Sequence, residues 1–132
     1  MRLSLRLPGD LRAAETARRA LSCFTNHIPN EVLDTLSLVV NELVTNSLLH
    51  ACMNGEPIDL VVDLDGERIS GSVTDPGRGF VPPPRQQPNL DATSGRGLFL
   101  VEQLSQRWGV ETDPQTSVWF EMPALAFVKL EA

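Results

Sequence analysis

"EVLDTLSLVVNELVTNSLLHA", residues 31–51, carries the pattern that decides the fold of this 132-residue chain. Its apolar residues recur every three or four positions, which is the spacing of an amphipathic helix. They stand at positions 32, 36, 39, 40, 43, 44 and 48. Asn30, directly before the stretch, is a residue type that often caps a helix start. We therefore predict a long helix with one buried face, capped by Asn30.

The same helix carries a line of three polar residues, Glu42, Asn46 and His50. Four residues turn a helix through about 400°, so each side chain is displaced from the last by only about 40°. A carboxylate, an amide and an imidazole therefore face one place. Taken alone, such a stripe is typical of a solvated helix face. Zinc binding is disfavoured, because the sequence has no HExxH pattern and this trio is a poor zinc cage.

The N-terminal part predicts a strand and a shorter helix. Residues 3–7, LSLRL, alternate apolar and polar side chains as a half-buried strand does, and the breaking residues PGD follow. Asp10 is a suitable cap for a helix that runs through residues 11–25.

Two further strands follow the long helix: IDLVVDLD, residues 58–65, and RISGSVTD, residues 68–75. Only Gly66 and Glu67 separate them, so an antiparallel hairpin is predicted. Residues 76–97 are rich in proline and glycine, and no regular element is expected there. A segment of this length without regular structure is usually a functional lid or a linker.

The C-terminal part predicts a third helix and a closing strand. GLFLVEQLSQRW, residues 97–108, has a helical pattern, and SVWFEM, residues 117–122, has a strand pattern. Residues 123–132 are either a short edge strand or a surface segment. The element order predicts an α+β fold, a two-layer sandwich in a single domain, residues 1–132, with helices on one face of a mainly antiparallel mixed sheet.

Composition limits the partners. With 11 Lys and Arg against 17 Asp and Glu, the net charge is −6, which repels nucleic acid and anionic membranes. No apolar stretch is expected to approach the ~20 residues that cross a bilayer. Cys23 and Cys52 show no CxxC spacing, and the first residues lack the apolar core of a signal peptide. We therefore expect a cytoplasmic protein that binds neither nucleic acid nor membrane directly.

Two glycine-containing motifs carry further chemistry. In DPGRGF, residues 75–80, Asp75 ends a predicted strand and offers two acceptor oxygens to a donor such as an exocyclic amine. In SGRGL, residues 94–98, the glycines precede a predicted helix, and free backbone N–H groups there suit an anion. Taken alone, the first is equally typical of a bulged turn and the second of a loop with positive φ. The second is not a Walker A loop, because no Lys-Ser or Lys-Thr follows its glycines.

Taken in order, these motifs resemble the ATP-binding domain of the gyrase, chaperone, histidine kinase and mismatch-repair (GHKL) ATPase superfamily. Within it, the sequence is most similar to the anti-sigma factor serine/threonine kinases. NELVTNSLLHA resembles the asparagine box of the family, DPGRGF its first glycine box, and SGRGLFLVEQL its second. The resemblance implies a Bergerat-type fold that binds ATP and Mg²⁺, with an ATP lid at about residues 80–95.

The resemblance also implies roles for the stripe on the long helix. Asn46 would ligate Mg²⁺, which prefers few protein ligands and keeps several waters. Glu42 would be the catalytic base that accepts the proton of an attacking hydroxyl. His50 would lie on the phosphate side of the site.

The remaining implied residues contact the nucleotide. Asp75 would accept from the adenine amino group. Where many relatives carry a threonine near the adenine, the alignment gives Ser117, which keeps the hydroxyl but loses the methyl group. Two groups of residues would surround the base and the phosphates: Gly77 and Gly79, and Gly95, Arg96 and Gly97.

The implied activity is a switch kinase that phosphorylates an anti-sigma factor antagonist and sequesters a sigma factor, with homodimer formation as a further expectation. An alternative is a nucleotide-binding module that sequesters a partner without phosphotransfer. A detached sensor histidine-kinase domain is disfavoured, because no dimerisation helix is seen in this short chain.

Overall fold

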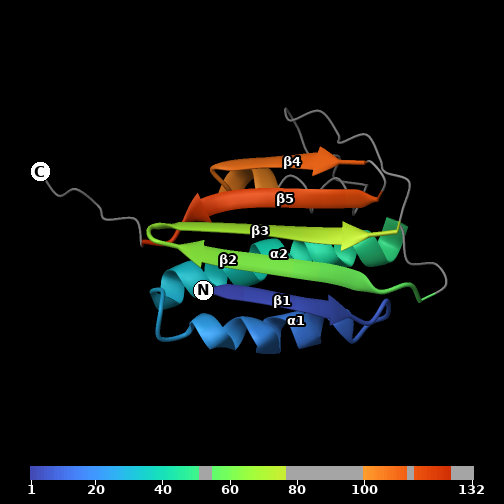
Figure 1. Cartoon of the computed structure of the whole chain (residues 1–132), viewed down its shortest axis with the longest axis horizontal. Helices are drawn as coiled ribbons and strands as arrows, with labels where there is room; N and C mark the ends of the chain where they lie inside the picture. The colour runs from blue at the N-terminus through green and yellow to red at the C-terminus, as the bar shows by residue number, and fades with distance from the viewer. Residues whose placement is uncertain (51–54, 77–99, 113–114, 126–132) are drawn as a thin grey trace, which may run out of the picture.

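The computed structural model describes residues 1–50, 55–76, 100–112 and 115–125. Their strands form one five-stranded sheet of order β1-β2-β3-β5-β4. The strands are β1 (Arg2–Leu7), β2 (Ile58–Asp65), β3 (Arg68–Asp75), β4 (Arg107–Glu111) and β5 (Thr116–Pro123). Helices α1 (Ala13–Leu21) and α2 (Asn30–His50) lie on one face of the sheet, and a 3-10 turn, η1 (Ser22–Phe24), follows α1 (Figure 1). The predicted α+β two-layer sandwich is confirmed.

One detail of the sheet differs from the prediction. The ladders β1–β2, β2–β3, β3–β5 and β4–β5 are all antiparallel. The parallel pair that a mixed sheet requires does not occur among the strands that the structure describes.

The central helix α2 follows the predicted pattern closely. Six of the seven predicted apolar positions are buried and Leu48 is half-buried. The buried ones are Val32, Leu36, Val39, Val40, Leu43 and Val44. The prediction that Asn30 caps the helix is wrong by one residue: Asn30 is its first residue, and the Pro29 carbonyl accepts from the Leu33 N–H at 3.0 Å. The buried apolar positions extend to Leu43 and Val44, so the apolar side of α2 faces the core up to its last turns.

The expectation that no stretch is long and apolar enough to cross a membrane is also wrong. Residues Asn30–Leu49 meet that criterion by length and composition. In the fold, the apolar side of this segment belongs to the hydrophobic core that the helices and the sheet share. Packing in that core accounts for its hydropathy.

The β2–β3 hairpin is confirmed with its predicted bounds. Asp65 pairs with Arg68 across the turn, and Gly66 has φ +62°, a conformation that glycine adopts without steric cost. Alternate residues of these strands face the helices. On β2, β3 and β5 they include Ile58, Leu60, Val62, Ile69, Val73, Val118 and Phe120.

The start of α1 also differs from the prediction. The helix begins at Ala13, and the residue at its cap position is Arg12, which makes no side-chain capping bond. Asp10 instead accepts from the backbone N–H of Arg12 at 2.9 Å and so closes the turn before the helix.

The predicted third helix is too long at its C-terminal end. Residues 100–104 are helical, but Arg107–Glu111 form strand β4. Trp108 pairs with Phe120 of β5, and the Trp119 indole lies over Gly109, where a Cβ would come within 2.8 Å of the ring. Pairing with β5 and the burial of Trp108 outweigh the helical spacing of this stretch.

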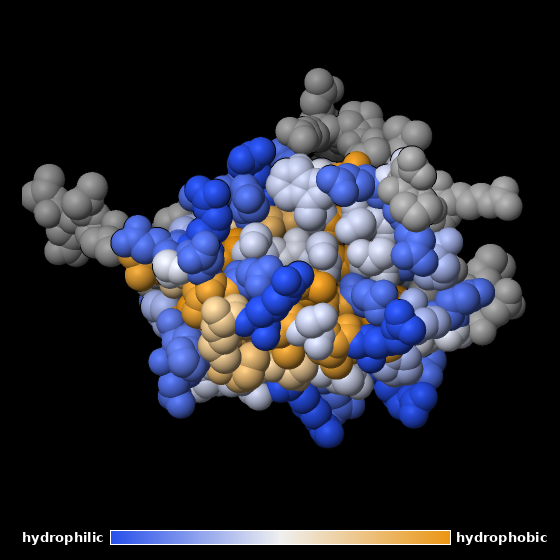
Figure 2. Space-filling view, in the orientation of Figure 1, coloured by the Kyte–Doolittle hydropathy of each residue, from blue (hydrophilic) through white to orange (hydrophobic). Residues whose placement is uncertain are grey.

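The second face of the sheet is covered by no described element. Figure 2 views this open face, where hydrophilic residues lie over the strands and hydrophobic ones show between them. Two ion pairs join β1 and β2 on this face: Arg2 with Asp63 at 3.6 Å and Arg6 with Asp59 at 2.9 Å. Such exposed pairs add little to stability, because water and salt screen them.

Candidate nucleotide site

The buried polar side chains of the described residues gather at one end of the sandwich. They are Asn46, Ser47, Asp75 and Thr116. The first two lie in the last turns of α2, Asp75 ends β3, and Thr116 begins β5. The C-terminal end of α2 lies behind the end of β3, and the two elements are in contact (Figure 1). Buried polar groups need partners, so this end of the fold is the candidate site.

Asn46 is the most informative of these residues. Its side chain is only 5% exposed, and its Oδ1 is buried without a hydrogen-bond donor among the described residues. An unsatisfied buried acceptor costs about 1–3 kcal/mol. The fold tolerates this cost where a ligand meets the oxygen.

The other two stripe residues flank Asn46 along α2. Glu42 lies one turn earlier and is half-buried. At a four-residue spacing, its carboxylate lies on the same helix face as the Asn46 amide. His50 is the last residue of α2, and its side chain lies outside what the structure describes.

Asp75 and Thr116 face each other across β3 and β5. They form a cross-strand pair, and both side chains are buried, at 4% and 2% exposure. Directly opposite residues on one face of an antiparallel pair bring their Cβ atoms within about 4.5–5.5 Å. A carboxylate and a hydroxyl thus stand side by side on the helix-covered face.

Ser117, which the sequence resemblance assigns to the adenine side of the site, lies on the other face of the sheet. Its hydroxyl accepts from the Thr74 hydroxyl at 3.1 Å, on the open side. Since side chains alternate along a strand, a residue beside Asp75 must share the parity of Val118 and Phe120. That residue is Thr116, which has both a hydroxyl and the methyl group that Ser117 lacks. The alternation of buried and half-buried residues along this strand is the sequence signal that distinguishes the two positions.

The glycine-box residues lie outside the described part of the chain. They are Gly77, Gly79, Gly95, Arg96 and Gly97, together with the predicted lid at about residues 80–95. Their placement stays a prediction.

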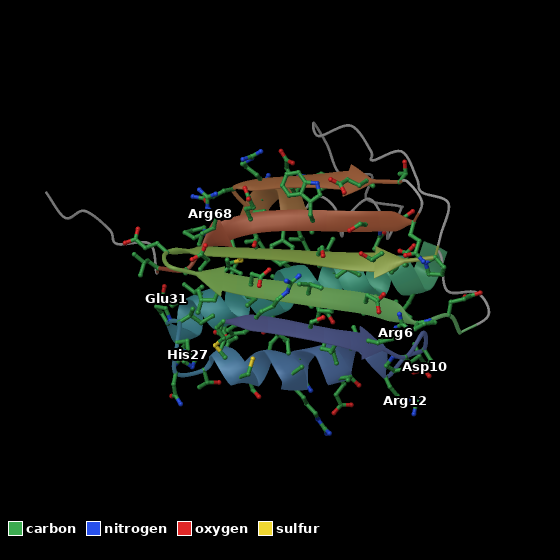
Figure 3. The ribbon with its side chains drawn as sticks, viewed as in Figure 1. Arg6, Asp10, Arg12, His27, Glu31 and Arg68 are labelled. Carbon is green, nitrogen blue, oxygen red and sulfur yellow. The ribbon has the colours of Figure 1, made fainter. Side chains whose placement is uncertain are left out.

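Two exposed ion pairs lie at the same end of the molecule. Figure 3 shows Arg6, Asp10 and Arg12 there, away from His27, Glu31 and Arg68 at the opposite end. Arg12 donates to both oxygens of Asp10, at 3.1 and 2.8 Å, and these bonds lower the pKa of Asp10 and raise the pKa of Arg12. The Asp59 carboxylate likewise raises the pKa of Arg6. Because both guanidiniums are paired, they are poor candidates for binding phosphate.

The site fits magnesium better than a metal held by protein alone. Among the described residues, no three His, Cys, Asp or Glu side chains cluster as a metal cage. Asn46 supplies one hard oxygen with no donor on it, and Mg²⁺ is commonly held by one or two protein oxygens while phosphates and waters complete its octahedron. Asn46 would hold the ion, which would supply charge neutralisation at the phosphates.

The chain matches the model of the histidine kinase-like ATPase domain over residues 7–122. It belongs to this family. The matched range includes Glu42, Asn46 and His50 of α2 as well as Asp75 and Thr116, and it ends one residue before the end of β5. Membership of this ATPase family implies that the chain binds ATP, and the end of the sandwich that buries Asn46 and Asp75 is the candidate place for it.

Solved structures share the fold of this histidine kinase-like ATPase domain. A structure of the RsbU and RsbW domains of a Mycobacterium tuberculosis protein aligns with 96% of this chain and 34% of its own, at TM-score 0.63 and 18% identity. This chain thus spans about a third of the chain in that structure. A blue-light activated histidine kinase from Erythrobacter litoralis aligns over 85% of this chain and 59% of its own, at TM-score 0.51 and 24% identity. A search of the curated proteins finds no match.

Proposed function

We propose that this histidine kinase-like ATPase domain is an ATP-dependent serine/threonine kinase of the anti-sigma type. It phosphorylates an anti-sigma factor antagonist and, in its other complex, sequesters a sigma factor. It acts in the cytoplasm, with no direct contact to nucleic acid or membrane, and a homodimer is compatible with this role.

One observation carries the proposal: the buried Asn46 oxygen lacks a donor among the described residues while a half-buried carboxylate, Glu42, lies one turn away on the same helix face. The oxygen suits the metal of Mg-ATP. The carboxylate suits a base beside the γ-phosphate. Because Glu42 is half-buried, a hydroxyl presented by another protein can approach it from solution.

The proposed reaction transfers the γ-phosphoryl group of ATP to a hydroxyl of the antagonist. The hydroxyl oxygen of the antagonist forms a bond to the γ-phosphorus of ATP, and the bond from that phosphorus to the β–γ bridging oxygen breaks. ADP leaves, and Glu42 accepts the hydroxyl proton. Positioning and charge stabilisation supply most of the rate in such reactions.

The nucleotide contacts of this proposal are those that the sequence resemblance implies, with Thr116 added because it pairs with Asp75. Asp75 accepts from the adenine amino group, and Thr116 stands beside it. His50, Gly95, Arg96 and Gly97 contact the phosphates, while Gly77 and Gly79 pass close to the base and ribose.

The choice of partners rests on the sequence resemblance. The structural neighbour from Mycobacterium tuberculosis contains RsbU and RsbW domains, which is compatible with a partner of the same kind for this chain. At 18% identity that likeness supports the fold, so the sigma factor and the antagonist have to be found by experiment.

A transfer assay tests the proposal. Purified protein, γ-labelled ATP, Mg²⁺ and a candidate antagonist should give a labelled antagonist. Glu42→Gln keeps the size of the side chain and removes the base, so transfer should fall by about 10²–10⁴-fold while ATP still binds. Glu31→Gln makes the same change in the exposed first turn of α2 and should leave transfer unchanged.

The result separates the two modes of action. If the wild type binds Mg-ATP and the antagonist but transfers no phosphate, the kinase proposal is wrong, and the chain is a nucleotide-binding module that sequesters its partner.

A further inference from the structure

One buried polar side chain at the candidate site has no part in the proposed reaction. Of the four that gather at this end of the sandwich, the proposed function uses Asn46 for the metal and Asp75 and Thr116 for the base. Ser47 is left, and it is only 3% exposed. A buried hydroxyl loses its hydrogen bonds to water, which opposes folding unless another group replaces them. A serine at this position therefore needs a physical reason.

Ser47 lies near the middle of the buried face of α2. Leu36, Val40 and Leu43 are 0–1% exposed, and the spacing of these residues and Ser47 keeps all four side chains within roughly 60° around the helix axis. α2 contacts β3, and its last turns lie behind the end of that strand (Figure 1). The Ser47 side chain thus faces the sheet at the end where β3 finishes in Asp75.

The Ser47 hydroxyl is not used within the helix. Serine and threonine in a helix can donate to the carbonyl four residues earlier, as Thr16 does to Arg12 at 2.8 Å and Thr35 does to Glu31 at 3.0 Å. Among the described residues, no hydrogen bond of this or another kind engages the Ser47 hydroxyl. The hydroxyl therefore remains available to a ligand that enters between α2 and the end of β3.

The adenine edge that meets Asp75 offers acceptors as well as a donor. Its amino group donates, and the ring nitrogens on the two sides of that group, N1 and N7, accept. A carboxylate only accepts, whereas a serine hydroxyl can donate. A hydroxyl close to Asp75 therefore supplies what the carboxylate lacks, and together they match the donor and acceptor order of adenine.

We propose that Ser47 is a base-reading residue of the nucleotide site: its hydroxyl donates to N1 or N7 of adenine, beside the amino group that donates to Asp75. The inference rests on the proposed function, which assigns adenine to Asp75. Asn46, displaced from Ser47 by about 100° around the helix, lies at the margin of the buried face. The last turns of α2 thus contact the metal with Asn46 and the base with Ser47.

Removing the hydroxyl should weaken binding without weakening the fold. Ser47→Ala hardly changes the shape of the side chain, and ATP affinity should fall by about fivefold, the loss expected for one hydrogen bond between neutral groups. The ligand-free variant should melt no lower than the wild type, because alanine favours a helix and leaves no hydroxyl to bury.

Modified nucleotides identify the atom that accepts. In 1-deaza-ATP and 7-deaza-ATP, a C–H group replaces one ring nitrogen, so each analogue lacks one acceptor. If Ser47 donates to N1, the wild type and Ser47→Ala should bind 1-deaza-ATP equally, and the fivefold difference should persist with 7-deaza-ATP. Donation to N7 gives the reverse. Comparing the variants and the ligands in this way isolates the single contact.

A matched variant controls for the change of residue type. Ser37 is half-buried in the first half of α2, so Ser37→Ala makes the same substitution in the same helix, away from the end of β3. It gains the same helix preference and should bind all three nucleotides as the wild type does.

The measurements are calorimetric titration with each nucleotide in the presence of Mg²⁺ and thermal unfolding without ligand. A loss for ATP that at least one deaza analogue abolishes supports the base-reading role. An unchanged ATP affinity in Ser47→Ala, or an equal loss with all three nucleotides, overturns it and leaves Ser47 a packing residue, with the proposed function intact. A wild type that does not bind ATP overturns the proposed function, and the base-reading role with it.

Discussion

The two halves of α2 are equally well buried but bury different chemistry. Between residues 30 and 40, the buried positions are Val32, Leu36, Val39 and Val40, all apolar. Between residues 41 and 49, Leu43 and Val44 continue the same stripe, but Asn46 and Ser47 are buried beside it. Packing against the core alone would not require polar side chains at the buried positions of the last turns.

The difference teaches how a site can be recognised in a core. Burying apolar surface stabilises the fold by roughly 25 cal/mol per Å², whereas burying an unsatisfied amide oxygen opposes folding. The first half of α2 therefore accounts for stability, and the second half retains a cost that the proposed Mg-ATP binding would offset. Substitutions in the two halves should separate stability from binding.

The largest effect is expected in the first half. Leu36 is 0% exposed, and Leu36→Ala should lower the free energy of unfolding by about 2–5 kcal/mol, through lost burial and the cavity left behind. Leu38→Ala is the matched control, since Leu38 is 40% exposed and should cost far less. Chemical denaturation of both variants gives the comparison. Similar losses for the two would contradict the assignment of the core.

The next effect belongs to the second half. Mg-ATP at ~100 times its dissociation constant should stabilise the wild type by about 2.7 kcal/mol. Asn46→Ala should lose this ligand-dependent stabilisation, while Asn41→Ala, the same change on the exposed side of α2, should keep it. Thermal unfolding with and without Mg-ATP measures the shift. A full shift in Asn46→Ala would remove the magnesium assignment.

A smaller effect, on nucleotide affinity, is expected for Thr116 at the start of β5. Thr116→Val keeps the shape of the side chain and removes the hydroxyl beside Asp75, so adenine nucleotides should bind more weakly by about 1 kcal/mol. Thr74→Val makes the same change on the open face, and Ser117→Ala removes the hydroxyl to which Thr74 donates. Titration with ATP should find both of these close to the wild type. A larger loss in Ser117→Ala than in Thr116→Val would restore the serine that the alignment indicated.

The smallest effect concerns the exposed carboxylate of Asp10 and varies with pH. Hydrogen bonds from Arg12 lower the pKa of Asp10 below its ordinary 3.8, so its contribution to stability is fully present above pH 3.8 and is lost as the pH falls through the lowered pKa. Asp10→Asn should therefore melt slightly below the wild type at neutral pH, with the difference vanishing in acid. A difference that grows on acidification would mean that another group titrates.

Much of this arrangement is readable from the sequence because local patterns and tertiary packing agree. The apolar positions of α2 and the Gly66-Glu67 hairpin were predicted from period and turn chemistry, and both are confirmed. The four-residue spacing in the sequence also predicts that Glu42 and Asn46 share one face of the helix. The burial of Asn46 could not be predicted from this pattern, because a polar stripe on an amphipathic helix usually faces water.

The errors have physical causes. The sequence predicts helix where β4 lies, since Val101, Leu104 and Trp108 keep a helical spacing and no glycine or proline occurs at Ser105. Only pairing with β5, which is distant information, turns this stretch into a strand. The structure places Ser117 on the open face and Thr116 beside Asp75, because in a strand a step of one residue reverses the face.

The order of the strands has a consequence for how the chain is made. Among the residues that the structure describes, β5 is the last strand in sequence, yet it lies inside the sheet and pairs with both β3 and β4. During synthesis on the ribosome, β4 therefore emerges before β5, the strand with which it pairs. Strand β3 likewise cannot pair with β5 until residues 76–115 have been synthesised. Pairing over such separations is slow compared with local contacts. Until residue 123 has left the exit tunnel, the growing chain should remain open to proteases and depend on chaperones, and its N-terminal fragments should not fold alone.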